Sequence, residues 1–97
     1  MTLTFLATIT VKPEYMEEAC QAVTAICPAT RAESGCIAFE PRRHADGSST
    51  ITIFEEWTGR EAFDYHHAQD YTKDVFAKYQ NWLASDPVLV EVKPLEG

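Results

Sequence analysis

The feature that most constrains this chain is the run Ile51–Trp57, which reads Ile-Thr-Ile-Phe-Glu-Glu-Trp. Because the side chains of a strand alternate between its two faces, Glu55 shares its face with both isoleucines and with Trp57. A carboxylate that is buried among apolar side chains needs a hydrogen-bond or ion-pair partner. The helix predicted to follow carries His66 in its second turn. We therefore expect either a structural pair between Glu55 and His66 or the polar end of a pocket.

Length and composition indicate one globular domain over residues 1–97, with 45% hydrophobic and 24% charged residues. The net charge is -7, and the few basic residues form no stripe, so nucleic acid and anionic membranes are poor partners. No apolar run approaches the roughly 20 residues that span a bilayer. The beginning of the chain does not read as a secretory signal. We expect no membrane association.

The three cysteines, Cys20, Cys27 and Cys36, lack the spacing of a metal site. No Cys-x-x-Cys occurs, and no two histidines lie four apart on one predicted helix, so no metal site is expected. An odd number of cysteines without a framework favours a reduced, cytoplasmic protein.

Hydrophobic periodicity predicts a strand over 3–11 and then a helix that begins at Lys12-Pro13. The helix carries an apolar stripe at three- and four-residue spacing and ends near Ser34. Pro28 lies inside the stripe, so a kink or a break is expected there. Gly35 then suits the left-handed position that often follows a helix.

The second half of the chain predicts a hairpin, two helical pieces and a last strand. The strand 36–43 pairs with 51–57 through the turn residues 45–48, and Pro41 suggests that the former is an edge strand or carries a bulge. Residues 59–83 are helical in two pieces hinged near 68–70. Asp86-Pro87 breaks the helix before a strand marked by alternating valines at 88–92.

The order β-α-β-β-α-β predicts a ferredoxin-like α+β fold with a four-stranded antiparallel sheet. Right-handed crossovers place both helical segments on one face of that sheet. Because the strands carry few charges on either side, the other face would be an apolar patch too large for a monomer. We therefore predict a homodimer with two sheets packed face to face, which is a dimeric α+β barrel.

Three motifs in order carry a resemblance to a known family: Ala32-Glu-Ser-Gly-Cys36, Phe54-Glu-Glu-Trp57, and His66 after the next helical turns. They resemble the antibiotic biosynthesis monooxygenase domain family, with its Glu-x-Gly-Cys turn, its Tyr/Phe-Glu-x-Trp strand end and its Ala-His helix. The resemblance runs over nearly the whole chain. It implies the dimeric α+β barrel with a pocket between sheet and helices in each protomer. Because members include cofactor-free oxygenases, haem-degrading oxygenases and an isomerase of a phosphorylated sugar, the resemblance indicates the fold better than the reaction.

Haem-degrading members resemble one another in an Asn, a Trp and a haem-ligating His where this chain has Leu6, His66 and Phe76. The resemblance therefore implies no haem, and we expect no cofactor.

The favoured hypothesis is a cofactor-independent monooxygenase that oxidises a small electron-rich aromatic, a phenol or quinol, with O2. An imidazole with an unperturbed pKa of about 6.5 can take a proton at cellular pH. His66 would be the catalytic base, and Glu55 would orient it. The two neighbours His66 and His67 diverge by about 100° around a helix, so at most one faces the sheet well. The predicted pocket lining is Trp57, Phe39, Phe63, Tyr71 and Tyr79.

Two alternatives stay open. One is an isomerase of a small polar carbonyl compound that uses the same histidine to move a proton. The other is a dimeric ligand-binding or accessory module without catalysis.

Overall fold

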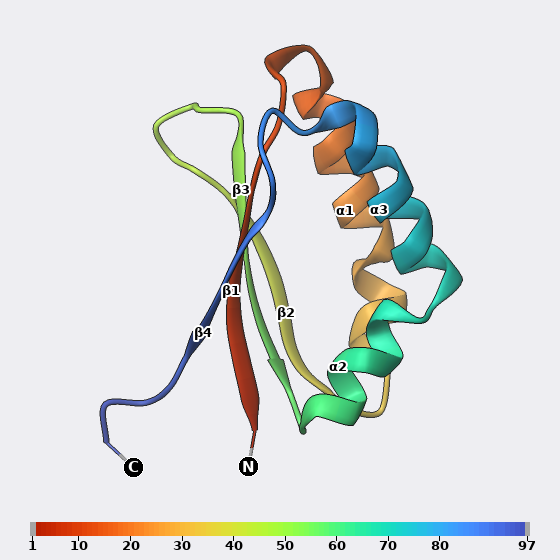
Figure 1. Cartoon of the computed structure of the whole chain (residues 1–97), viewed down its shortest axis with the longest axis vertical. Coiled ribbons are helices and arrows are strands. Elements are labelled where there is room, and N and C mark those ends of the chain that lie inside the picture. Colours follow the sequence, from red (N-terminus) through yellow and green to blue (C-terminus); the bar gives the residue numbers. More distant parts are fainter. Residues whose placement is uncertain (1, 97) are drawn as a thin grey trace.

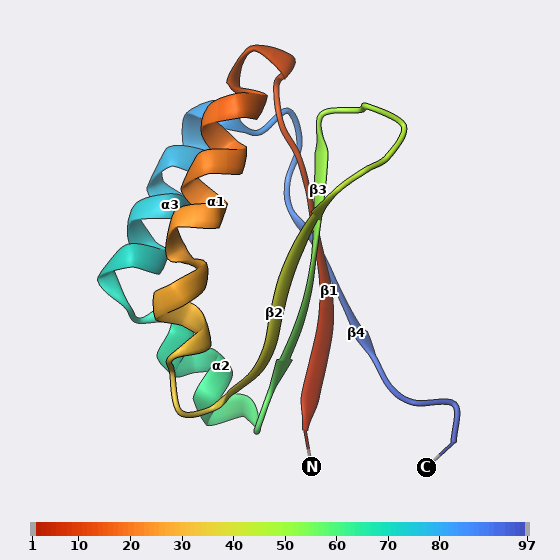
Figure 2. The ribbon, with the colours of Figure 1, turned by 180° about the vertical axis from the view of Figure 1, so that it is seen from behind.

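The computed structural model describes residues 2–96 and has two layers (Figure 1). Helices cover one face of a four-stranded antiparallel sheet, and the opposite face is bare, as the view from behind also shows (Figure 2). The predicted order β-α-β-β-α-β and the ferredoxin-like α+β fold are confirmed. In chain order the elements are β1 (Leu3–Thr10), a 3-10 turn (Pro13–Tyr15), α1 (Met16–Arg31), β2 (Cys36–Arg43), β3 (Thr50–Trp57), α2 (Arg60–His67), α3 (Asp70–Trp82) and β4 (Val88–Val92). Within the described range, no helix is both long and apolar enough to cross a bilayer.

The sheet has the strand order β2-β3-β1-β4, so β1 and β3 form its centre. These two strands pair from Leu3 opposite Trp57 to Thr10 opposite Thr50. The predicted hairpin between β2 and β3 is present, and β2 is an edge strand with an irregular register near its start. An edge position tolerates Pro41, which cannot donate to the ladder.

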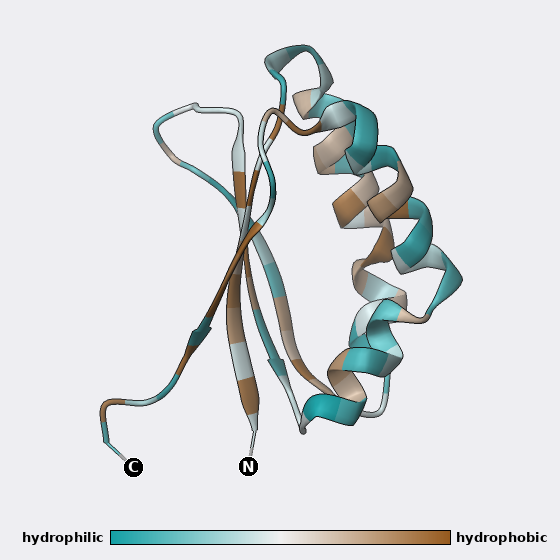
Figure 3. Ribbon diagram, in the orientation of Figure 1, coloured by the Kyte–Doolittle hydropathy of each residue, from teal (hydrophilic) through white to brown (hydrophobic). Residues whose placement is uncertain are grey.

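The core lies between the sheet and the helices. On β3 the alternation is as predicted, because one face is buried and the other is partly exposed. Hydrophobic and hydrophilic residues alternate along α1 and α3, as expected of helices between a core and solvent (Figure 3). The buried hydrophobic residues are Phe5, Ile9, Val11, Met16, Ala19, Val23, Cys27, Phe39, Ile51, Ile53, Trp57, Val75 and Tyr79.

The bare face of the sheet carries large apolar side chains. Leu6 on β1 lies opposite Phe54 on β3 and opposite Val90 on β4, and partners in register point to the same side. Their exposed fractions are 37%, 37% and 48%. We call these three residues the apolar sheet face.

The structure bears on two predictions about the end of α1. The helix continues through Pro28 to Arg31, so of the kink or break expected there the break is absent. Gly35 does not adopt a left-handed conformation; among the described residues, Gly47 in the hairpin turn is the one that does. The reason for glycine at 35 is close approach: a Cβ placed there would lie 2.3 Å from the Cβ of Ala62 on α2.

This contact gives the first testable prediction. Gly35→Ala should lower the free energy of unfolding by about 1–3 kcal/mol, the usual range for overpacking, because the turn must move away from α2. Ala62→Gly alone should cost about 0.5–1 kcal/mol of helix stability. Urea unfolding of both variants and of the double variant measures the coupling.

The double variant should lose less stability than the sum of the two single variants, because the colliding methyl group is gone. Simple additivity would show that the close approach does not govern this position.

Candidate functional site

A cavity of about 230 Å³ lies between the sheet and the helices. Most of its lining is apolar and comes from every layer of the fold: Ala7, Ile9, Val23, Ile26, Phe39, Ile53, Val75, Phe76, Pro87, Val88 and Leu89. Its polar lining is Glu55, His66, His67, Thr72 and Tyr79. Because Phe76 on α3 and Leu89 on β4 are 43% and 49% exposed, the cavity opens to solvent between these elements. A mostly apolar chamber with a few converging polar groups is typical of a small-molecule site.

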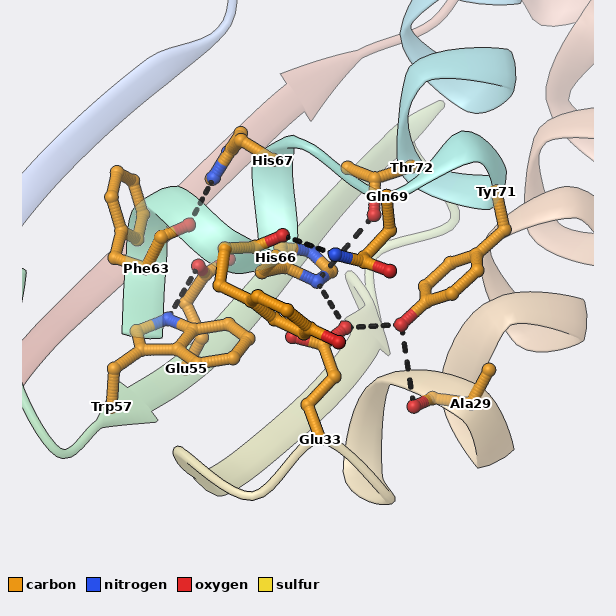
Figure 4. A network of polar contacts seen from close by, with 11 residues as sticks. Ala29, Glu33, Glu55, Trp57, Phe63, His66, His67, Gln69, Tyr71 and Thr72 are labelled. Atoms are coloured by element: carbon orange, nitrogen blue, oxygen red, sulfur yellow. Dashed lines mark hydrogen bonds and ion pairs between the residues drawn. The ribbon is translucent and has the colours of Figure 1, made fainter. Parts of the chain in front are cut away.

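His66 is the buried polar group of α2, with 4% of its surface exposed. Its ring packs beside the indole of Trp57 at a centroid distance of 4.8 Å and beside Phe39 at 5.6 Å. Its Nδ1 lies 2.9 Å from Oε2 of Glu33 (Figure 4). The hydroxyl of Thr72 makes a longer contact of 3.5 Å with the same nitrogen. The imidazole is therefore held by two aromatic rings and at one nitrogen.

Glu33 is a residue of this site that was not predicted. It lies in the turn between α1 and β2, and its side chain is 5% exposed. Oε2 of Glu33 accepts hydrogen bonds from His66 and from the hydroxyl of Tyr71 on α3 (Figure 4). Its other oxygen, Oε1, is buried without a partner among the described residues. One sequence signal could have drawn attention to Glu33, because a carboxylate just beyond a helix C-terminus faces the negative end of the helix dipole.

The predicted pairing of Glu55 with His66 is wrong. Oε1 of Glu55 accepts a hydrogen bond of 3.0 Å from the indole nitrogen of Trp57, two residues along the same face of β3. Glu55 and His66 nevertheless line the same cavity. The strand supplies the partner of Glu55 locally, so the histidine is left to a carboxylate from another segment.

The other predicted lining residues fall into two groups. Phe39 and Tyr79 line the cavity. The remaining three lie around the histidines and not on the cavity wall. Trp57 and Phe63 pack against the rings of the two histidines, and Tyr71 reaches Glu33 on the far side of His66.

His67 lies closer to the cavity than the helical geometry suggested. It is half-buried, and its Nδ1 donates to the carbonyl of Phe63 at 2.9 Å. Both histidines line the cavity, but of the two His66 is buried and His67 is only half-buried, in keeping with the expectation that at most one of them faces the sheet well.

Burial sets the protonation of the site. Loss of hydration lowers the pKa of His66, although the Glu33 carboxylate acts in the opposite direction. Burial raises the pKa of Glu55, against the hydrogen bond from Trp57. Burial, with the nearby Glu55 charge, also raises the pKa of Tyr79 to about 12. His66 is therefore a neutral imidazole near pH 7, and a neutral imidazole can accept a proton.

The cysteines and the acidic side chains do not extend this site into a metal centre. Cys20, Cys27 and Cys36 are free thiols. Among residues 2–96 no three His, Cys, Asp or Glu side chains are grouped closely enough to hold a metal ion.

Comparisons with known proteins point to one family. Residues 2–78 match the family model described as antibiotic biosynthesis monooxygenase. The uncharacterized protein sll1783 of Synechocystis is 30% identical over 76 residues, a match that covers 78% of this chain and 52% of that protein. The chain thus spans about half the length of this curated relative.

Solved structures agree in fold. Rv0793 from Mycobacterium tuberculosis has a TM-score of 0.91 at 23% identity, covering 100% of this chain and 98% of that one. PA3566 from Pseudomonas aeruginosa has a TM-score of 0.90 at 22% identity, covering 97% and 94%. At these identities the likeness establishes the fold alone.

The lowered pKa of His66 predicts how stability depends on pH. Just below pH 6.5 the unfolded chain binds a proton at this residue that the folded chain does not bind. The free energy of unfolding should therefore fall as the pH falls from 6.5 towards the folded-state pKa, by at most about 1.4 kcal/mol per pH unit. Urea unfolding between pH 7.5 and 5 measures this slope.

His66→Gln should flatten the acid slope, whereas His44→Gln in the exposed hairpin should keep the slope of the wild type. An equally steep slope in the His66→Gln variant would contradict the assignment of a neutral buried imidazole.

Proposed function

Because the chain belongs to the antibiotic biosynthesis monooxygenase family, we propose that it oxidises a small electron-rich aromatic compound, a phenol or quinol, with O2 and without a cofactor. The observation that carries the proposal is the neutral imidazole of His66 on the wall of an apolar cavity. This combination offers a base and a dry space to a substrate that can itself supply the electrons.

The size of the cavity supports an aromatic substrate. An apolar protein cavity of about 150 Å³ holds one benzene molecule. By that comparison, the 230 Å³ here accept one ring or two fused rings. The aromatic and aliphatic lining favours such a planar molecule and excludes water from it.

The proposed reaction begins with proton transfer from the phenolic hydroxyl to His66. The phenolate has a higher electron density than the phenol and can pass an electron to O2. In the overall change the phenol and O2 give a quinone and water: one ring C–H and the phenolic C–OH both become C=O, one oxygen atom enters the substrate, and the other leaves as water with the two hydrogens released. The substrate supplies all four electrons through these two changes, so the balance requires no external reductant. The proton held by His66 returns during formation of water.

Other residues have assigned roles in this proposal. Glu55, which faces the same space, binds a second oxygen of the substrate through its carboxyl group. Phe39 and Tyr79 contact the ring of the substrate, and Trp57 supports both His66 and Glu55 from behind.

One of the alternatives receives less support. A phosphorylated carbonyl substrate would call for basic side chains, but no Lys or Arg is among the residues that line this cavity. A ligand-binding module without catalysis would have the same chamber, and the absence of oxygen uptake is the result that would favour it.

The proposal includes a homodimer. The apolar sheet face, Leu6, Phe54 and Val90, is uncovered by the helices of its own chain. A second copy that packs its sheet on this face would bury all three side chains and complete a barrel of two sheets.

The dimer can be tested by light scattering at micromolar concentration. The wild type should have twice the monomer mass, and Val90→Lys should shift the equilibrium towards monomer because it places a charge within the apolar sheet face. Gln21→Lys, on the exposed side of α1, is the matched control and should remain dimeric. A monomeric wild type would contradict this part of the proposal.

The reaction can be tested by oxygen uptake with dihydroxynaphthalenes and anthrones, without added flavin or metal. His66→Ala should lower the rate by about 10²–10⁴, the usual contribution of a positioned acid–base group. His44→Ala should retain the rate of the wild type, because that histidine lies in the exposed hairpin. The value of kcat/KM for the wild type should rise with pH and then level off. The midpoint of this rise should lie below pH 6.5, since burial lowers the pKa of His66.

Equal uptake by wild type and His66→Ala would remove this histidine from the mechanism. The absence of uptake with every substrate would favour the isomerase or the accessory module.

A further inference from the structure

Three segments that are far apart in the sequence meet at one carboxylate oxygen. Glu33 comes from the turn between α1 and β2, His66 from the end of α2, and Tyr71 from the first turn of α3. Figure 4 shows the imidazole and the phenol approaching the carboxylate from different elements. The contacts span 33 and 38 positions of sequence, so no local motif accounts for them.

A neutral imidazole carries one N–H, and the partner of each ring nitrogen decides where that hydrogen lies. A carboxylate accepts and does not donate, so Nδ1 of His66 must carry the hydrogen in its 2.9 Å contact with Glu33. Nε2 is then the nitrogen with a free lone pair. This is the tautomer that a base on the cavity wall requires.

We propose that Glu33 is a positioning residue, which holds His66 as the Nδ1–H tautomer and so keeps Nε2 available to take a proton from a molecule in the cavity. The identity of that molecule rests on the proposed function. The tautomer of His66 rests only on its hydrogen bond with Glu33. Once Nε2 is protonated, the Glu33 carboxylate also stabilises the imidazolium, as an acidic partner of a catalytic histidine does elsewhere.

The surroundings of Glu33 fit this role better than a purely structural one. Buried polar atoms that only support a fold are usually hydrogen-bonded. Here one oxygen accepts two hydrogen bonds, and the buried Oε1 has no partner in the described part of the chain. The negative charge therefore acts mainly on the imidazole and on the phenol.

Tyr71 shares the oxygen with His66 and so modulates its effect. Burial and the neighbouring Glu33 charge raise the pKa of Tyr71, which keeps it a hydrogen-bond donor. The phenol of Tyr71 stabilises the Glu33 carboxylate by donating a hydrogen bond to it, and so reduces the extent to which the carboxylate raises the pKa of His66. The other ionisable side chains that line the cavity with His66 are His67 on α2, Glu55 on β3 and Tyr79 on α3.

The experiment is a nitrogen-15 NMR titration of the histidine side chains, recorded on the protein without substrate. The wild type should show the Nδ1–H tautomer for His66 at neutral pH. Glu33→Gln should lower the pKa of His66 and give a mixture of tautomers, because the amide carries no charge and can also donate. Tyr71→Phe should shift the pKa of His66 upward, because Glu33 then acts on the imidazole alone.

The pKa of His66 should shift in opposite directions in the two variants. A general loss of packing would shift it in the same direction in both, so the signs separate positioning from loss of packing. Tyr15→Phe, a tyrosine that stacks on Trp82, is the matched control and should leave the pKa of His66 unchanged. If Glu33→Gln does not fold, the wild-type tautomer and the Tyr71→Phe shift still decide the matter.

An Nε2–H tautomer in the wild type, or a His66 pKa that does not rise in Tyr71→Phe, would overturn the proposal. Oxygen uptake is measured separately. If NMR gives the predicted tautomer and pKa shifts but no substrate leads to oxygen uptake, the role of Glu33 is kept and the proposed reaction is rejected.

Discussion

The arrangement of the cavity wall depends on one buried interaction, the hydrogen bond between Glu33 and His66. It ties the turn after α1 to the end of α2, and Tyr71 adds the start of α3 to the same carboxylate. Close packing supports it, because Gly35 lets the turn approach α2 and its carbonyl accepts a hydrogen bond from Thr58. A buried carboxylate is costly without partners, so the packing that brings these segments together is also what makes Glu33 tolerable there.

Most of the fold could be predicted from local patterns. Strand alternation at Ile51–Trp57 identified the buried face of β3, and the turn residues around Gly47 identified the hairpin. The end of α1 was harder to predict. Gly35 fits two physical explanations, a left-handed backbone and a close approach, and only the position of Ala62 in space separates them.

The candidate site could be predicted in part. Glu55 was identified because it is out of place among the apolar residues on its face of the strand, and His66 because it follows on the next helix; both do line one cavity. Their partners could not be derived in the same way. Glu55 has a donor two residues away on its own strand, whereas the partner of His66 lies 33 positions earlier in the chain. Long-range pairing of this kind depends on how helices pack, which periodicity does not encode.

The proposed reaction depends on transfer of a proton from an aromatic hydroxyl to His66. A structure of the protein with a naphthol bound in the absence of oxygen tests this transfer most directly. If His66 takes the proton, one naphthol should lie in the cavity with its oxygen within about 3 Å of Nε2 of His66, the distance at which a base can take a proton. A naphthol that binds with its hydroxyl directed to the mouth near Phe76 and Leu89, away from His66, would contradict it.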